Sequence, residues 1–321
     1  MKPKVWISIW ALTGIVVTLV LGLFDNIDAK RTDNLNILRL QHSADYSDLD
    51  YLFVGSSYVY SGIDPELFAA EGWDIYNLGS PSAGPYFNQI ITDDYLNGAK
   101  TPPGTIMLLM DPMMFASSAD NWRLYRIHRY LREPLSHFAL VKKFSAWTDY
   151  PSLLLNSAEM GLRNIGRQLS GSRKALDVPD LNRGFMPSDE VVTEKIIRET
   201  KQYYTHLEDT HFDIEKVKHY QRYIQQLKDQ GHEVILFEVP SHLVTAFLTE
   251  DYLISYEVAL EYLAEADHDI LFNDLKLAEN CYRNIDHLNS QGAAQLSASL
   301  IEKLKAFRAA KIGSTETPTA R

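Results

Sequence analysis

The stretch DYLFVGSSYVYSGIDPELF, residues 50–68, decides the fold because an apolar run of strand length ends there on Gly55, Ser56 and Ser57. Further apolar runs of similar length follow along the chain, and most are continuous rather than alternating with polar residues. Continuous runs are typical of strands buried on both faces of a parallel sheet. The predicted strands are at 51–55, 74–79, 105–111, 233–239 and 269–274.

Segments with helical spacing lie between these runs, at 86–97 and at 212–231, where Gly231 is a stop signal. After the last run, residues 289–311 have the pattern of an Asn- or Ser-capped helix. Strands that alternate with helices indicate an α/β fold. The sequence therefore predicts a doubly wound parallel sheet in a flavodoxin-like, three-layer arrangement.

The amino terminus contains an uncharged stretch, residues 5–24, close to the roughly 20 residues that span a bilayer as a helix. Lys2 and Lys4 precede it, and no clear small-x-small cleavage site follows it. We expect a cytoplasmic tail and transmembrane anchor over residues 1–31, with the bulk of the chain extracytoplasmic, in the periplasm or at the cell surface. A cleaved signal peptide and a buried core helix are the alternatives.

The remaining chain is expected to form one α/β domain over 32–312 and a disordered tail over 313–321. The interval of about 113–205 is too long for a simple connection and predicts a helical insertion with structure of its own. Within it, residues 121–183 contain eleven Lys or Arg and five Asp or Glu, although the whole chain has a net charge of −11. This basic segment is either a solvated helix face or a surface for anionic lipid or polymer.

Composition excludes several classes of function. The net charge of −11 argues against nucleic acid as a partner, because binding its backbone requires a basic surface. A single cysteine, Cys281, excludes an internal disulfide and a zinc site built on several thiolates. No metal site and no cofactor are expected.

Small and polar residues follow the predicted strands, at the sheet edge where ligands of open α/β folds bind. These are Gly55-Ser56-Ser57, then Gly79-Ser80, then Asp111-Pro112, then the segments 238–242 and 284–293. Together they supply a hydroxyl, accessible backbone N–H groups and an imidazole, which are the groups needed for acyl transfer. An ordinary turn at Ser57 and a helix-capping histidine at position 287 are the non-catalytic alternatives.

The blocks resemble those of the SGNH, or GDSL, hydrolases. Gly55-Ser56-Ser57 is similar to the first block of that family, Gly79 to the second, and IDHLNSQGAAQLS, residues 285–297, to the last. The anchor, the Gly-Ser-Ser variant and the insertion most resemble the membrane-anchored branch that includes the teichoic-acid D-alanyl-transfer protein and the alginate O-acetylation proteins. The resemblance covers about residues 50–310 in block order, and the insertion itself matches no known segment.

The resemblance implies a role for each matching residue. Ser57 would be the nucleophile and His287 its base, while the backbone N–H groups of Ser57 and Gly79 would form the oxyanion hole. Asp111 stands where the family has Asn, and an ionised Asp cannot donate to an oxyanion, so it is expected to position substrate or to begin a turn.

The position three residues before His287 is Asn284, where the family has Asp. We therefore expect a Ser57–His287 dyad that Asn284 assists through its carbonyl oxygen. Asp286 is a further candidate for positioning substrate. As the sequence neighbour of His287, it is expected to need an unusual backbone to reach the imidazole.

The resulting prediction is a serine esterase or O-acyltransferase that acts on acyl esters of an exported or cell-envelope glycan through an acyl-serine intermediate. Expected partners are an acylated glycan or acyl donor, the membrane through residues 5–24, and a membrane-bound acyltransferase. The alternative is a catalytically weak or inactive scaffold of the same fold that binds an anionic polymer or a membrane partner.

Overall fold

The computed structural model describes residues 39–40, 42–117, 182–198, 211–240, 245, 248–266, 268–272 and 274–315. The chain divides into two compact units, one of residues 1–41 and 121–179 and the other of residues 42–120 and 180–321. Nearly all described residues belong to the second unit, which contains the sheet. The predicted anchor at 5–24 and most of the predicted insertion lie outside the described residues.

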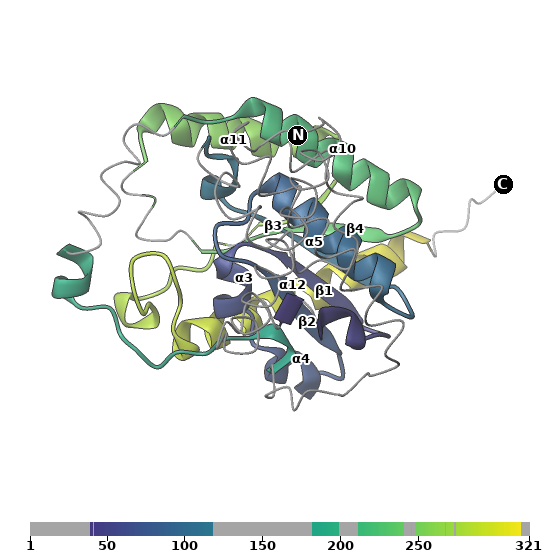
Figure 1. Ribbon diagram of the computed structural model, residues 1–321, viewed down its shortest axis with the longest axis horizontal. Coiled ribbons are helices and arrows are strands. Elements are labelled where there is room, and N and C mark those ends of the chain that lie inside the picture. The colour runs from purple at the N-terminus through teal and green to yellow at the C-terminus, as the bar shows by residue number, and fades with distance from the viewer. Residues whose placement is uncertain are drawn as a thin grey trace, which may run out of the picture. The chain divides into compact units, whose positions relative to one another are not determined.

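The second unit is built on a five-stranded sheet in which every pair of neighbouring strands is parallel (Figure 1). Along the sheet the strands follow the order β2-β1-β3-β4-β5, the flavodoxin-like order, with β1 and β3 adjacent at the switch point. The α/β class predicted from the apolar runs is therefore confirmed. The strands are β1 (Tyr51–Gly55), β2 (Ile75–Gly79), β3 (Thr105–Met110), β4 (Glu233–Glu238) and β5 (Asp269–Leu271).

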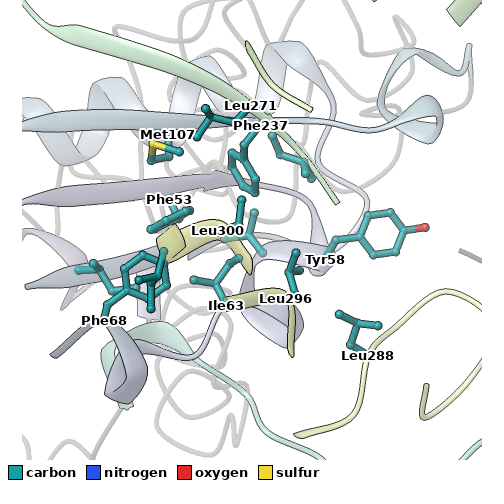
Figure 2. Packing of buried hydrophobic residues seen from close by; sticks show 14 of the residues in the cluster. Phe53, Tyr58, Ile63, Phe68, Met107, Phe237, Leu271, Leu288, Leu296 and Leu300 are labelled. Atoms are coloured by element: carbon teal, nitrogen blue, oxygen red, sulfur yellow. The ribbon is translucent and has the colours of Figure 1, made fainter. Parts of the chain in front are cut away.

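Both faces of the central strands are buried, which explains why their sequences are continuously apolar. One face joins a large core in which Phe53, Met107 and Phe237 point toward Leu296 and Leu300 of the last helix (Figure 2). Successive strand side chains point to opposite faces, so the alternate residues of the same strands are directed toward the other face. On that second face, helices α5 (Pro85–Gly98) and α10 (Ile214–Asp229) pack against each other and against the sheet.

Several helices begin after residues whose side chains accept from the first-turn N–H groups, as expected for N-caps. Asp64, Asp213 and Thr249 cap α4 (Pro65–Ala70), α10 and α11 (Glu250–Glu265) in this way. The last helix, α12 (Ser290–Thr315), follows Asn289, whose Oδ1 accepts from Gly292 N at 3.1 Å. The Asn-capped helix predicted after the last strand is therefore confirmed.

The structure also differs from the sequence-based expectations at several boundaries. Strand β5 ends at Leu271 rather than near 274. Helix α12 runs to Thr315, so it includes the first three residues of the predicted tail 313–321, and residues 316–321 lie outside the description. Short 3-10 helices occupy Ser43–Asp45, Pro112–Phe115, Asn182–Gly184 and Glu279–Cys281. Within the part of the chain that is described, no helix is long and apolar enough to cross a membrane.

Candidate active site

The turn from β1 into helix α3 (Ser57–Gly62) explains why two hydroxyl residues follow each other. Ser56 is the N-cap of α3, and its buried Oγ accepts from Tyr58 N at 3.4 Å and donates to Asp111 Oδ2 at 3.3 Å. Ser57 is the first residue of the helix and is only partly buried. The first serine is thus used to build the turn, and the second is presented at the carboxyl edge of the sheet.

Gly79 ends β2 directly beside this turn, paired in register with Gly55. A Cβ atom at Gly79 would lie 2.6 Å from Ser56 O, 2.8 Å from Val59 Cβ and 2.9 Å from Tyr60 N. Only glycine therefore allows α3 to pack onto the end of β2. This close approach is a structural reason for the glycine, and its role in an oxyanion hole stays a prediction.

Asp111 follows β3, the strand next to β1, and is 1% exposed. Its Oδ1 accepts from Met113 N at 2.7 Å, and its Oδ2 accepts from Ser56 Oγ. Burial raises the pKa of this carboxyl to about 7, an effect that the hydrogen bonds from Met113 N and Ser56 Oγ oppose. Both oxygens accept hydrogen bonds within the protein, and Asp111 begins the turn before Pro112. Its role in positioning substrate stays a prediction.

His287 lies in a short loop that side-chain and backbone hydrogen bonds hold closed. An antiparallel bridge pairs Tyr282 with Leu288 at its base, and Arg283 N donates to His287 O at 3.0 Å. Inside the loop, Asn284 Oδ1 accepts from the backbone N–H groups of Asp286 at 3.2 Å and His287 at 2.8 Å. Asn284 therefore folds the loop back on itself.

The imidazole has two oxygen partners on the same nitrogen. His287 Nδ1 lies 2.6 Å from Asp286 Oδ1 and 3.1 Å from Asn284 Oδ1. Asp286 was expected to need an unusual backbone to reach the ring, and the fold of the loop around Asn284 brings this neighbouring carboxylate to Nδ1. Both oxygens act as acceptors, so Nδ1 carries the proton and Nε2 of the neutral ring carries the lone pair.

Nε2 of His287 is buried and has no hydrogen-bond partner among the described residues. The ring lies against α3, with its centroid 5.8 Å from that of Tyr58 and 6.5 Å from that of Tyr60. The structure thus brings His287 together with Asn284 and Asp286, and places it beside the helix that begins with Ser57. It does not join Ser57 Oγ to Nε2 by a hydrogen bond.

Sequence reasoning missed two contributors to this arrangement. Ser56 was treated only as part of the block, although a serine that precedes a short helix is a typical N-cap. Asn289, 3% exposed, was predicted only as a helix cap, and its side-chain hydrogen bonds to Glu190 O and Asn280 O were not predicted. Among the described residues, no group of three His, Cys, Asp or Glu is arranged to hold a metal ion.

Comparisons with known proteins leave the family open. No family model and no curated protein matches the sequence. One similar solved structure is described provisionally as a platelet activating factor from Streptococcus pneumonia, with 14% sequence identity and a TM-score of 0.42. That match covers 89% of this chain and 98% of the other. A TM-score this low supports no argument from that structure, so the α/β class rests on the sheet and helices themselves.

Proposed function

We propose that this chain is a membrane-anchored, extracytoplasmic serine esterase or O-acyltransferase of the SGNH type, acting on acyl esters of an exported or cell-envelope glycan. The observation that carries the proposal is that the two ring nitrogens of His287 have different surroundings. A carboxylate oxygen 2.6 Å from Nδ1 orients the ring, and the opposite nitrogen is buried without a partner among the described residues. A general base for a serine hydroxyl requires this division between the two nitrogens.

The position of Ser57 supports the same chemistry. It follows β1, and the order β2-β1-β3 makes the ends of β1 and β3 the switch point, outside which ligands of open α/β sheets bind. His287 lies against the rings of Tyr58 and Tyr60, on the helix that Ser57 begins.

In the proposed mechanism, Ser57 Oγ attacks the carbonyl carbon of an ester while Nε2 of His287 takes the hydroxyl proton. The negative oxygen of the tetrahedral intermediate is stabilised by backbone N–H groups, for which Ser57 and Gly79 are the predicted donors. Collapse of the intermediate breaks the ester C–O bond, and the imidazolium returns the proton to the departing alcohol. Water or a sugar hydroxyl then attacks acyl-Ser57 and gives its proton to Nε2, and Ser57 regains a proton as the acyl group leaves.

The decisive experiment is covalent labelling of the purified chain with a fluorophosphonate probe. We expect one adduct, located on Ser57 by peptide mass spectrometry, and none in Ser57→Ala. Ser56→Ala is the matched control, because it removes the neighbouring hydroxyl and leaves the nucleophile. An adduct on any other residue, or no adduct on a folded chain, contradicts the proposal.

Esterase and acyltransferase activity are separated by adding an acceptor. With an acyl-ester donor present, an acyltransferase releases the donor alcohol faster when an oligosaccharide is added, and it yields an acylated oligosaccharide. An esterase yields the free acid at an unchanged rate.

One observation favours the alternative of a catalytically weak or inactive scaffold. The Ser57 hydroxyl and Nε2 of His287 are not hydrogen-bonded in the structure. For a scaffold, fluorophosphonate labelling fails while binding of an anionic polymer or a vesicle with anionic lipid persists. The same Ser57→Ala variant then binds as tightly as the unmodified chain.

A further inference from the structure

A strap of extended chain, residues 185–192, connects the two halves of the candidate site. It follows the 3-10 helix Asn182–Gly184, at the carboxyl end of the predicted insertion, and is drawn in teal in Figure 1. Phe185 and Val192 at its two ends are 7% and 9% exposed, whereas Val191 is 47% exposed. The strap is therefore anchored by apolar side chains at its ends and runs over the surface between them.

Backbone hydrogen bonds tie the strap to α3 on one side and to the His287 loop on the other. Met186 N donates to Tyr60 O at 2.7 Å, which joins the strap to the helix that begins with Ser57. Val192 N donates to Tyr282 O and Ser290 N donates to Ser188 O, each at 2.7 Å. These bonds reach both ends of the loop that carries His287.

Asn289 fastens the strap to the loop through its side chain. Its Nδ2 donates to Glu190 O of the strap at 3.2 Å and to Asn280 O at 2.7 Å. Its backbone N donates to Cys281 O at 3.0 Å, and its Oδ1 accepts from Gly292 N to cap α12. A single side chain thus joins the strap, the segment before the loop and the last helix.

We propose that the strap sets the position of the His287 ring relative to α3, and that Asn289 is the positioning residue that holds the strap in place. The inference rests on the proposed function, since it concerns the gap between the Ser57 hydroxyl and Nε2 of His287. It gives the carboxyl end of the insertion a role in the site. Asn289 touches neither reacting group and acts through the loop.

The strap can position His287 because the loop that carries this residue contains no helix or strand of its own. Within the loop, Asn284 fixes the shape of the turn, and the bonds at the two ends of the loop connect that turn to its surroundings. The strap bonds hold both ends and continue to Tyr60 of α3. A displacement of about 1 Å between reacting groups lowers rates on the order of 100-fold, so loss of the tie is measurable.

The test uses Asn289→Asp, which keeps an oxygen acceptor for Gly292 N and removes both Nδ2 donors. Thr249→Ala is the matched control, because it removes a cap from α11, where no residue of the proposed site lies. Hydrogen exchange is followed on peptides that cover 185–192, and the rate of fluorophosphonate labelling is measured at a temperature where all variants are folded. In Asn289→Asp we expect the strap amides to exchange about tenfold faster or more. We expect fluorophosphonate labelling of Ser57 to be about 10- to 100-fold slower.

The two readouts separate a positioning role from a purely structural one. Unchanged exchange in the strap overturns the claim that Asn289 holds it. Faster strap exchange with an unchanged labelling rate overturns the claim that the strap positions His287. If the backbone amides of β1 and β3 also exchange faster in Asn289→Asp, the substitution destabilises the whole domain. That result also overturns the proposal.

Failure of the proposed function is recognised separately, because the unmodified chain is then not labelled at Ser57. In that case the exchange measurement still tests the tie, and the position of the ring is read from the imidazole nitrogen resonances of His287, assigned with His287→Gln. We expect these resonances to shift in Asn289→Asp and to stay unchanged in Thr249→Ala. Resonances that do not move overturn the positioning role.

Discussion

The turn after β1 and the loop before α12 supply the two halves of the candidate site, and they are built by different means. In the turn, Ser56 and Ser57 follow β1 and Gly79 ends the neighbouring strand β2, so strand pairing fixes their relative positions. In the loop, backbone N–H groups that donate to the side-chain oxygens of Asn284 and Asn289 replace regular structure. The difference teaches that sheet topology determines where a residue lies, whereas local polar contacts determine what its side chain touches.

The largest expected effect comes from the carboxylate on the loop side. Asp286→Asn removes the charge beside Nδ1 of His287 and keeps the size of the side chain. In serine proteases the equivalent change lowers kcat about 10⁴-fold, because the ring adopts the wrong tautomer and its cation loses stabilisation. We expect fluorophosphonate labelling of Ser57 to slow by about 10³-fold or more.

Asp286→Glu is the matched control for this prediction, since it keeps the charge and changes only its reach. Circular dichroism and thermal melting establish that both variants fold. Labelling of Asp286→Asn within about tenfold of the unmodified rate would show that Asp286 does not orient the ring.

The second prediction concerns packing on the turn side. In Gly79→Ala the new Cβ meets Ser56 O and Tyr60 N, backbone atoms that cannot rotate away. Overpacking of this kind costs about 3 kcal/mol, which urea unfolding measures directly. Gly72→Ala is the control, because its φ is +79° and nothing lies within 4 Å, so only backbone strain of about 1 kcal/mol remains. Equal losses in the two variants would contradict the packing argument.

The contrast between the turn and the loop also shows which features can be predicted from the sequence. The apolar runs predict the α/β class and the five strands found among the described residues, because burial on both faces leaves a continuous apolar signal. They also predict that the residues after those runs gather at one sheet edge. The contact between Asp286 and His287 could not be predicted, since it depends on the turn that Asn284 forms. The strap and the hydrogen bonds that Asn289 donates to backbone carbonyls were missed, because a carbonyl acceptor leaves no trace in the sequence.

The third prediction uses the buried carboxyl beneath the turn. The folded-state pKa of Asp111 is raised from 3.8 to about 7, so the folded chain binds a proton that the unfolded chain has lost between these values. The contribution of this proton to stability is therefore present in full below about pH 4 and is lost as the pH rises through 7. Asp111→Asn cannot ionise and can keep the hydrogen bond from Met113 N.

Urea unfolding of both chains at pH 5 and at pH 7 tests this prediction. The stability of Asp111→Asn relative to the unmodified chain should improve by on the order of 2 kcal/mol between the two pH values, since one pKa unit corresponds to about 1.4 kcal/mol. Other titrating groups, such as Asp93 with a pKa raised to about 6, are common to both chains and cancel in the difference. A difference that does not change with pH would show that Asp111 is already ionised at pH 5.

The smallest expected effect distinguishes between two sources of the orienting carboxylate, position 284 as in the SGNH hydrolases and Asp286 as in this structure. Asn284→Asp restores the acid that the SGNH hydrolases have three residues before the histidine. If that position supplied the orienting charge, the substitution would raise the labelling rate by orders of magnitude. We expect a change of less than about threefold, because a carboxylate oxygen of Asp286 already lies 2.6 Å from Nδ1, and because Oδ1 of residue 284 is engaged by two backbone N–H groups.

Combining Asn284→Asp with Asp286→Asn completes this comparison. Asn284 Oδ1 lies 3.1 Å from Nδ1 of His287. A carboxylate oxygen at the same place is near enough to accept from the ring when residue 286 is an uncharged Asn. The double variant should therefore recover part of the labelling rate that Asp286→Asn loses. Recovery would mean that the loop holds two interchangeable sites for one carboxylate, and that this chain uses the one adjacent to its histidine.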